Sequence, residues 1–124
     1  MIDGIRVGCD VVSVAEVADS IATFGDRYLH RVFTAAEIDD CAGAPERLAA
    51  RFAAKEAVIK VFAEPEAHFP LLDIEIRGTG AAPTLHLSGV TAERARAQGW
   101  GQTEVSLSHA DCHAMAVVVV TCAT

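Results

Sequence analysis

Residues 45–62 read PERLAARFAAKEAVIKVF and predict one long helix. Alanine is the best helix former, and Pro45 suits the first turn, where its missing N–H would have no helical partner. Pro65 and Pro70 prevent the helix from continuing much further. We therefore expect an alanine-rich helix of roughly five turns against which the remaining elements can pack.

The same stretch contains the only two lysines of the chain, Lys55 and Lys60, on either side of Glu56. At about 3.6 residues per turn, Glu56 and Lys60 lie one turn apart on the same helix face. Such a pair is a common way to stabilise a solvated helix. The chain does not use lysine on its other helices, however, so the cluster favours chemistry on phosphates.

Capping patterns and hydrophobic periodicity divide the rest of the chain into short elements. Two capping-box patterns, Ser13 with Glu16 and Thr34 with Glu37, mark helix starts. After the long helix, apolar and polar residues alternate, which predicts strands. The predicted elements, in chain order, are strand 5–11, helix 13–24, helix 34–41, helix 45–62, strand 71–77, strand 84–88, helix 90–98, strand 103–109 and strand 114–121.

These elements predict an α+β fold, a single domain over residues 1–124 with one antiparallel sheet packed on the long helix. A turn at residues 78–83 joins two of the strands as a hairpin. The run 114–121 is almost continuously apolar, so we expect it to form a central strand covered on both faces.

Charge and composition narrow the partners of the protein. A net charge of −7 and an isoelectric point of about 5.1 argue against nucleic-acid binding, which needs a basic surface. No apolar run reaches the roughly 18–20 residues of a membrane helix, and the N-terminus lacks a signal-peptide pattern. We therefore expect a cytoplasmic protein. The four cysteines lack zinc-like spacing, and we expect them to be small core residues.

Three groups of polar residues are candidates for chemistry: Asp10 at a strand end, Glu56 with Lys60, and His109 before a buried strand. Each alone is typical of structure: a turn aspartate, a surface pair and a packed histidine. Together, the two carboxylates suit Mg²⁺, which takes one or two protein carboxylates and completes its shell with water and phosphate. Lys60 can neutralise that phosphate, and Arg51 and His109 can bind a further one.

Three stretches carry a family resemblance: GCDVV at 8–12, RFAAKEAVIK at 51–60 and SLSH at 106–109. In order and spacing they resemble the signatures of the 4′-phosphopantetheinyl transferase superfamily, and in particular its short holo-(acyl-carrier-protein) synthase type. The run RVFTAAEI at 31–38 and the hairpin at Pro83 look like that family as well. The resemblance covers essentially the whole chain.

The resemblance implies a reaction in which the phosphopantetheine arm of coenzyme A moves to a serine of an apo acyl carrier protein, releasing adenosine 3′,5′-bisphosphate. By similarity, Asp10 and Glu56 would hold Mg²⁺ and Lys60 would neutralise phosphate oxygens. Arg51 and His109 would be candidates for the 3′-phosphate of coenzyme A. The base that deprotonates the carrier serine would be Glu56 or a metal-bound water.

The resemblance also implies an assembly. Larger relatives are internal duplications with the site between two halves, so a chain of this length is expected to form a homotrimer with sites between subunits. The carrier would be of the fatty-acid or the polyketide type. Neither a membrane nor a nucleic acid is an expected partner.

Three positions depart from the family pattern. The helix start 14–19 lacks the basic residue that would meet an acidic carrier. Glu64 and Glu66 follow Lys60 where relatives have a glycine-rich loop, and negative charge there would repel a nucleotide unless it points away. Ala81 and Ala82 stand where a basic residue is common.

Two other functions remain open from the sequence. A non-catalytic relative could bind coenzyme A or a carrier as an assembly or regulatory subunit, which would account for the missing bases. A metal-dependent phosphohydrolase of coenzyme A-like substrates would need a positioned water in place of the carrier serine.

Overall fold

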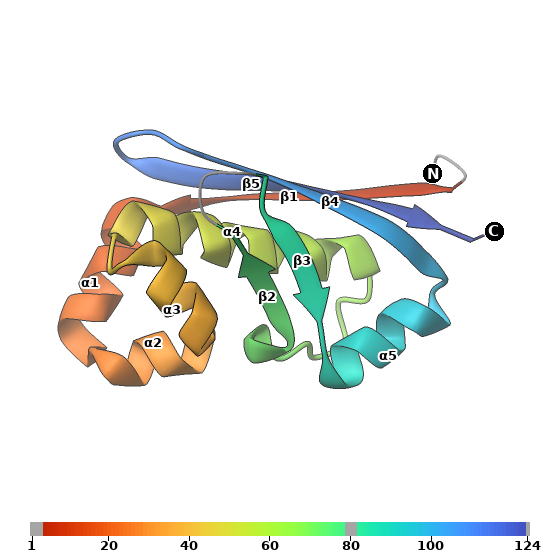
Figure 1. Ribbon diagram of the computed structural model, residues 1–124, viewed down its shortest axis with the longest axis horizontal. Helices are drawn as coiled ribbons and strands as arrows, with labels where there is room; N and C mark the ends of the chain where they lie inside the picture. The colour runs from red at the N-terminus through yellow and green to blue at the C-terminus, as the bar shows by residue number, and fades with distance from the viewer. Residues whose placement is uncertain (1–3, 79–81, 124) are drawn as a thin grey trace.

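The computed structural model describes residues 4–78 and 82–123 and shows one α+β domain (Figure 1). A 3₁₀ turn at Leu71–Asp73 precedes the second strand. The helices and strands, in chain order, are β1 Ile5–Ser13, α1 Val14–Phe24, α2 Asp26–Val32, α3 Ala35–Cys41, α4 Pro45–Phe62, β2 Ile74–Arg77, β3 Thr84–Leu87, α5 Gly89–Ala97, β4 Trp100–His109 and β5 His113–Cys122.

The long helix α4 begins and ends where the sequence predicts. It begins at Pro45 and ends before Ala63, whose φ of 53° is left-handed and closes the helix. Its alanines are buried, Ala53 and Ala57 without any exposed surface, and they bring the sheet close to the helix backbone. A Cβ atom added to Gly8 of β1 would lie 2.1 Å from the carbonyl oxygen of Ala57, so this close packing requires glycine.

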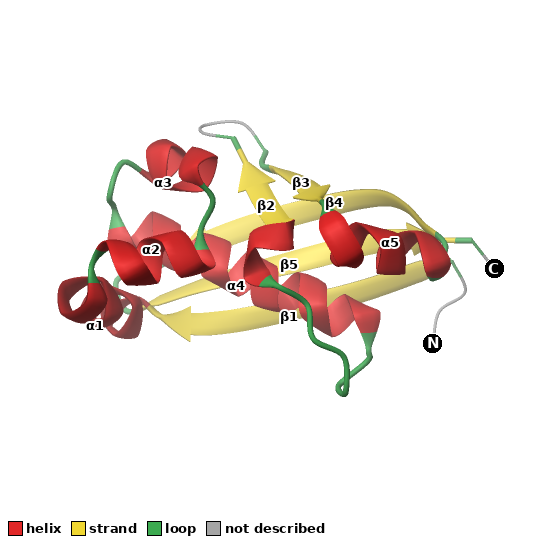
Figure 2. Cartoon of the chain, turned by 90° about the horizontal axis from the view of Figure 1, so that it is seen from below, coloured by secondary structure: helices red, strands yellow, loops and turns green. Residues whose placement is uncertain are grey.

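The strands form two sheets, so the prediction of one sheet is wrong. One sheet has three antiparallel strands in the order β1-β5-β4, and the other is the two-stranded ribbon β2-β3. The helix α4 lies across one face of the three-stranded sheet, and the ribbon lies on the β4 side of α4 (Figure 2). Alternation in a sequence marks a strand but not its hydrogen-bonding partner, because the partner depends on tertiary packing.

The central strand β5 is covered on one face only within the single chain, which corrects the prediction of two covered faces. Ala116, Val118 and Val120 are buried against α4. Met115 and Val119, on the opposite face, are 42% and 38% exposed. An apolar run without alternation shows that both faces are apolar, and it does not show what covers each of them.

Other differences are local. The helix α2 was not predicted, although Asp26 in its first turn and Arg31 in its last complement the helix dipole, because seven residues are too few to show a periodicity. The predicted strand 71–77 starts as a 3₁₀ turn and is shorter. Residues 79–81 of the predicted turn lie outside the described residues.

The capping predictions were tested at both helix starts. Thr34 and Glu37 form the complete capping box at α3, whereas at α1 the structure records the bond from the Glu16 N–H to the Ser13 hydroxyl. The cysteine prediction is right for Cys41, which is buried, and wrong for Cys9 and Cys112, which are exposed. Of the helices in the described ranges, none combines the length and apolarity that a bilayer crossing requires.

Candidate functional site

The first cluster of polar side chains lies between the inner face of β1 and the C-terminal half of α4. Asp10 and Lys60 meet there, and the Lys60 ammonium nitrogen lies 2.8 Å from Asp10 Oδ1. The same ammonium donates a hydrogen bond of 3.0 Å to the carbonyl oxygen of Cys9. Strand β1 places Asp10 on the same face as Gly8, so the close packing at Gly8 fixes the distance between Asp10 and α4.

Glu56 belongs to this cluster through its charge. Partial burial raises the pKa of the Glu56 carboxyl, the negative charge of Asp10 raises it further, and Lys60 opposes both effects. A carboxylate whose ionisation is disfavoured by burial and by a neighbouring negative charge gains from a cation placed beside it. The cluster therefore has the electrostatic character of a site for a hard divalent cation.

The two carboxylates of Asp10 and Glu56 fit a magnesium ion better than a metal whose ligands all come from the protein. In residues 4–78 and 82–123 no group of three His, Cys, Asp or Glu side chains could hold a metal ion. Mg²⁺ typically takes one or two carboxylates from the protein and fills its remaining positions with water and substrate phosphate. Two oxygen donors without sulfur or imidazole match that preference.

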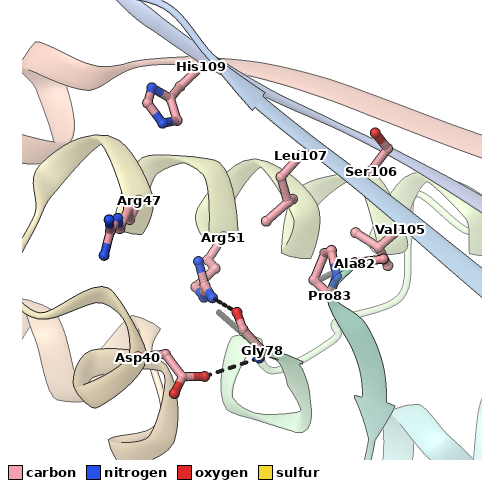
Figure 3. A pocket seen from close by; sticks show the side chains of 10 residues that line it. All are labelled: Asp40, Arg47, Arg51, Gly78, Ala82, Pro83, Val105, Ser106, Leu107 and His109. Carbon is pink, nitrogen blue, oxygen red and sulfur yellow. Dashed lines mark hydrogen bonds between the residues drawn. The ribbon is translucent and has the colours of Figure 1, made fainter. Parts of the chain in front are cut away.

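The second cluster lines a cavity of about 620 Å³ between α4, β4 and the β2–β3 ribbon (Figure 3). Arg47, Arg51 and His109 bring two guanidinium groups and one imidazole to its wall, and Asp40 adds a carboxylate. The full lining is Asp40, Arg47, Arg51, Gly78, Ala82, Pro83, Val105, Ser106, Leu107 and His109. A hollow with two permanent cations suits a phosphate group.

Arg51 is held firmly in this cavity. Only 5% of its surface is exposed, and one terminal nitrogen donates a hydrogen bond of 2.7 Å to the Gly78 carbonyl oxygen. Its Nε atom is buried without a hydrogen-bond partner in the described part of the chain. Arg47 was missed by the sequence analysis, although its position one helical turn before Arg51 places both on the same face of α4.

The two clusters lie on different faces of α4. Arg51 and Lys60 are nine residues apart, which at about 100° per residue places them on nearly opposite sides of the helix. The strands agree with this, because Asp10 lies on β1 and His109 on β4, at the two edges of the three-stranded sheet. The structure brings Asp10, Glu56 and Lys60 together and Arg51 and His109 together, but it separates the two groups within one chain.

Lys55 belongs to neither cluster, which corrects the interpretation of both lysines as neighbours of Glu56. Its side chain is fully buried and its ammonium lies 2.8 Å from Glu37 Oε1 on α3. The next residue along a helix is rotated by about 100°, so Lys55 faces α3 and β2 whereas Glu56 faces β1.

The acidic segment after Lys60 is partly compensated. Arg94 of α5 forms a salt bridge with Glu64 and holds the pKa of that carboxyl below its usual range. Gln98 donates a further hydrogen bond to Glu64. Glu66 is exposed. The Glu64 carboxylate therefore points towards α5 and is paired there. This removes the repulsion of a nucleotide that the sequence predicted for this residue.

Comparison with known proteins gives these clusters a family context. The family model described as the 4′-phosphopantetheinyl transferase superfamily matches residues 6–117. A holo-[acyl-carrier-protein] synthase of Koribacter versatilis is 41% identical over 118 residues, covering 91% of this chain and 94% of the relative. Another, of Chloroflexus aggregans, is 43% identical over 128 residues, covering 90% of this chain and 91% of the relative.

A solved structure supports the same family. The crystal structure of the Helicobacter pylori holo-[acyl-carrier-protein] synthase in complex with coenzyme A superimposes with a TM-score of 0.82 and 30% sequence identity, covering 93% of this chain and 99% of that chain. The residues matched by the family model, 6–117, include both clusters. The chain therefore belongs to the 4′-phosphopantetheinyl transferase superfamily and, within it, to the short holo-(acyl-carrier-protein) synthase type.

Proposed function

We propose that this protein transfers the 4′-phosphopantetheine arm of coenzyme A to a serine of an apo acyl carrier protein in a Mg²⁺-dependent reaction. The observation that carries the proposal is the pairing of a carboxylate cluster, Asp10 with Glu56, and a separate cavity with two arginines. These are the two kinds of site that a pyrophosphate and a distant 3′-phosphate need. The similarity to a synthase solved with coenzyme A supports the same substrate.

The reaction balances without an external oxidant or reductant. The carrier serine oxygen forms a bond to the phosphorus that bears the pantetheine arm. The bond from that phosphorus to the bridging oxygen of the pyrophosphate breaks, and adenosine 3′,5′-bisphosphate leaves. The serine proton passes to a base, for which Glu56 is a candidate because burial and Asp10 raise its pKa.

The side chains of the first cluster would divide the remaining work. Bound Mg²⁺, held by Asp10 and Glu56, would neutralise the charge that develops on the pyrophosphate oxygens. Lys60, whose ammonium lies beside Asp10 and is mostly exposed, can turn to the same oxygens. Phosphoryl transfer of this kind depends on positioning and charge neutralisation more than on covalent help from the protein.

The second cluster would bind the other end of coenzyme A. Arg51, anchored at Gly78, and the exposed His109 are candidates for the 3′-phosphate, and Arg47 adds a third cation. Because the clusters face apart in one chain, one coenzyme A would have to bridge two protomers. A homotrimer with sites between subunits satisfies this geometry, since a ring joins different surfaces of neighbouring protomers.

The apolar outer face of the three-stranded sheet supports the proposal of a trimer. Val7 and Val11 of β1 are each 62% exposed, and Met115 and Val119 of β5 continue the same apolar face. Continuous apolar surface of this kind marks an interaction site in soluble proteins. The exposed free thiols of Cys9 and Cys112 suit a reducing compartment, in line with action in the cytoplasm.

Intact-mass spectrometry tests the function. Apo acyl carrier proteins of fatty-acid and polyketide type are incubated with the protein, coenzyme A and Mg²⁺. We expect the mass of one phosphopantetheine to be added, and we expect a chelator or Glu56→Gln to prevent the addition. If no carrier gains mass while the protein still binds coenzyme A, the transfer function is wrong and a non-catalytic binding role takes its place.

A further inference from the structure

A buried ion pair lies between α3, α4 and β2, outside both clusters. The ammonium of Lys55 lies 2.8 Å from Glu37 Oε1, and neither side chain has any exposed surface. Burial lowers the pKa of the Lys55 ammonium, and Glu37 opposes that shift. Burying two charges costs so much solvation that an apolar pair often stabilises a fold as well or better. The pair is therefore better explained by the groups that its directional hydrogen bonds hold in place than by a gain in stability.

The pair holds the strand β2. Lys55 donates to the carbonyl oxygens of Leu71, at 2.9 Å, and of Ile74. Glu37 Oε2 accepts the backbone N–H of Ile76 at 2.9 Å. Ile74 and Ile76 also pack in the core, but apolar attraction is non-directional. Hydrogen bonds require a set distance and angle, so the buried pair fixes β2 along its own axis.

β2 needs such an anchor because its ribbon is separate from the main sheet. Its ladder runs to β3 alone, and in the described part of the chain neither strand pairs with β1, β5 or β4. Gly78, directly after β2, and Ala82 and Pro83, directly before β3, nevertheless line the cavity that contains Arg51. The position of one cavity wall therefore depends on side-chain bonds to α3 and α4.

A second pair of residues, one helical turn from Glu37 on α3 and from Lys55 on α4, binds the backbone directly after β2. Asp40, three residues after Glu37, accepts the Gly78 N–H at 3.2 Å, and Arg51, four residues before Lys55, donates to the Gly78 carbonyl at 2.7 Å (Figure 3). The carbonyl of Gly78 is the hydrogen-bond partner that the structure records for the Arg51 guanidinium within the described residues. Where β2 sits thus decides where that guanidinium points.

We propose that Glu37 and Lys55 are positioning residues for the phosphate cavity. They fix β2 against α3 and α4 and, through Gly78, hold Arg51 in the orientation that receives a phosphate. The proposal rests on the proposed function in so far as it takes that phosphate to be the 3′-phosphate of coenzyme A. Weakening the pair should lower affinity for the nucleotide end of the substrate and leave the chemistry at Asp10 intact.

The test uses two variants and one matched control. Glu37→Gln keeps the size of the side chain but replaces one of its two acceptor oxygens with an NH₂ donor, so it cannot accept from both Lys55 and the Ile76 N–H. Lys55→Met keeps the apolar stem and removes the ammonium. The control Phe69→Leu removes a core contact, the stacking on Phe62 at 4.3 Å, and touches neither cluster. The KM for coenzyme A, kcat and the Kd for adenosine 3′,5′-bisphosphate are measured at a temperature at which all variants are folded.

We expect the KM and the Kd of Glu37→Gln to rise about tenfold, the effect of losing one hydrogen bond to a charged group. At saturating coenzyme A, we expect kcat within about twofold of wild type, and we expect Phe69→Leu to change neither constant. Equal constants in Glu37→Gln and the control, or a loss confined to kcat, would overturn the proposal. Glu37→Gln carries the test by itself if Lys55→Met does not fold.

A measurement without ligand separates this proposal from the function. Amide hydrogen exchange at Ile76 and Gly78 should be faster in Glu37→Gln than in a control of equal melting temperature, while exchange in β5 stays the same. If wild type fails to modify any carrier, the proposed function fails, and this local exchange still decides the positioning role. If exchange in Glu37→Gln is faster by the same factor at all amides of the chain, the positioning role is wrong.

Discussion

Glu56 lies where a negative charge is disfavoured, because burial raises its pKa and Asp10 raises it further. In metal-free protein, an acid whose pKa is raised on folding contributes most to stability below its ordinary value of 4.5. That contribution is lost as the pH rises through the folded pKa. Glu56→Gln, which carries no charge, should therefore melt at a higher temperature than wild type at pH 7 and lose this advantage as the pH approaches 4.

Thermal unfolding in a chelating buffer at both pH values checks this prediction. Adding Mg²⁺ should raise the melting temperature of wild type, because the ion binds the folded state, and should leave Glu56→Gln almost unchanged. Turnover should be abolished in the variant. A variant that melts below wild type at pH 7 without metal would show that Glu56 is stabilised in its ionised form, and the magnesium assignment would lose its electrostatic support.

Lys60 is mostly exposed and its ammonium already neutralises Asp10. We expect its charge to matter most when negative charge develops on the leaving phosphate, so Lys60→Ala should lower kcat by about 10²–10³, as for a lost transition-state donor. Its KM for coenzyme A should change by less than about threefold. Steady-state kinetics with Lys60→Arg as the charge-preserving control makes the comparison. A change in KM alone would contradict the assigned role.

At the scale of elements, the packing of β1 on α4 sets the geometry of the first cluster. Gly8 lets the strand approach until a Cβ would lie 2.1 Å from the Ala57 carbonyl oxygen and 2.9 Å from a methyl of Val61. Gly8→Ala should therefore push β1 away from α4 and lower the free energy of unfolding by about 1–3 kcal/mol, as overpacking does. Asp10, two residues along the same face, should move with it.

Denaturant unfolding and the Kd for Mn²⁺ measure the two consequences of Gly8→Ala separately. The control is Val120→Ala, a buried position on the inner face of β5 where a cavity lowers stability without displacing β1. We expect both variants to lose stability and Gly8→Ala alone to lose metal affinity. If the two variants bind Mn²⁺ equally well, the close packing at Gly8 does not set the position of Asp10.

The whole molecule divides its proposed site between two edges of one sheet and exposes an apolar face between them. Val119, at the centre of that face, is 38% exposed. Val119→Glu should place a charge in the trimer interface, shift the sedimenting species from trimer to monomer and remove activity. The control Val90→Glu changes an exposed valine on α5 and should leave the trimer intact. If either variant is an active monomer, the proposal of a site shared between subunits is wrong.

The sequence predicted elements and chemistry where the signal is local. The ends of α4 followed from Pro45 and Pro65, and the capping box of α3 followed from Thr34 and Glu37. The contact between Asp10 and Lys60 is different, because 50 residues separate them. The sequence grouped them through Mg²⁺ and phosphate chemistry and through the family resemblance, and it did not predict their direct contact. Arg47 could have been found from its spacing to Arg51, and α2 from its terminal charges.

Most of the elements, the α+β class and the residue types available for phosphate chemistry could be predicted from the sequence, because they depend on spacing, capping and composition over a few turns. Three features depend on the tertiary structure: the strands form two sheets, Lys55 forms an ion pair with Glu37, and Arg51 and Lys60 lie on opposite sides of α4. Those outcomes depend on which distant groups can share a low-dielectric interior, and burial and hydrogen bonding are satisfied by the fold as a whole.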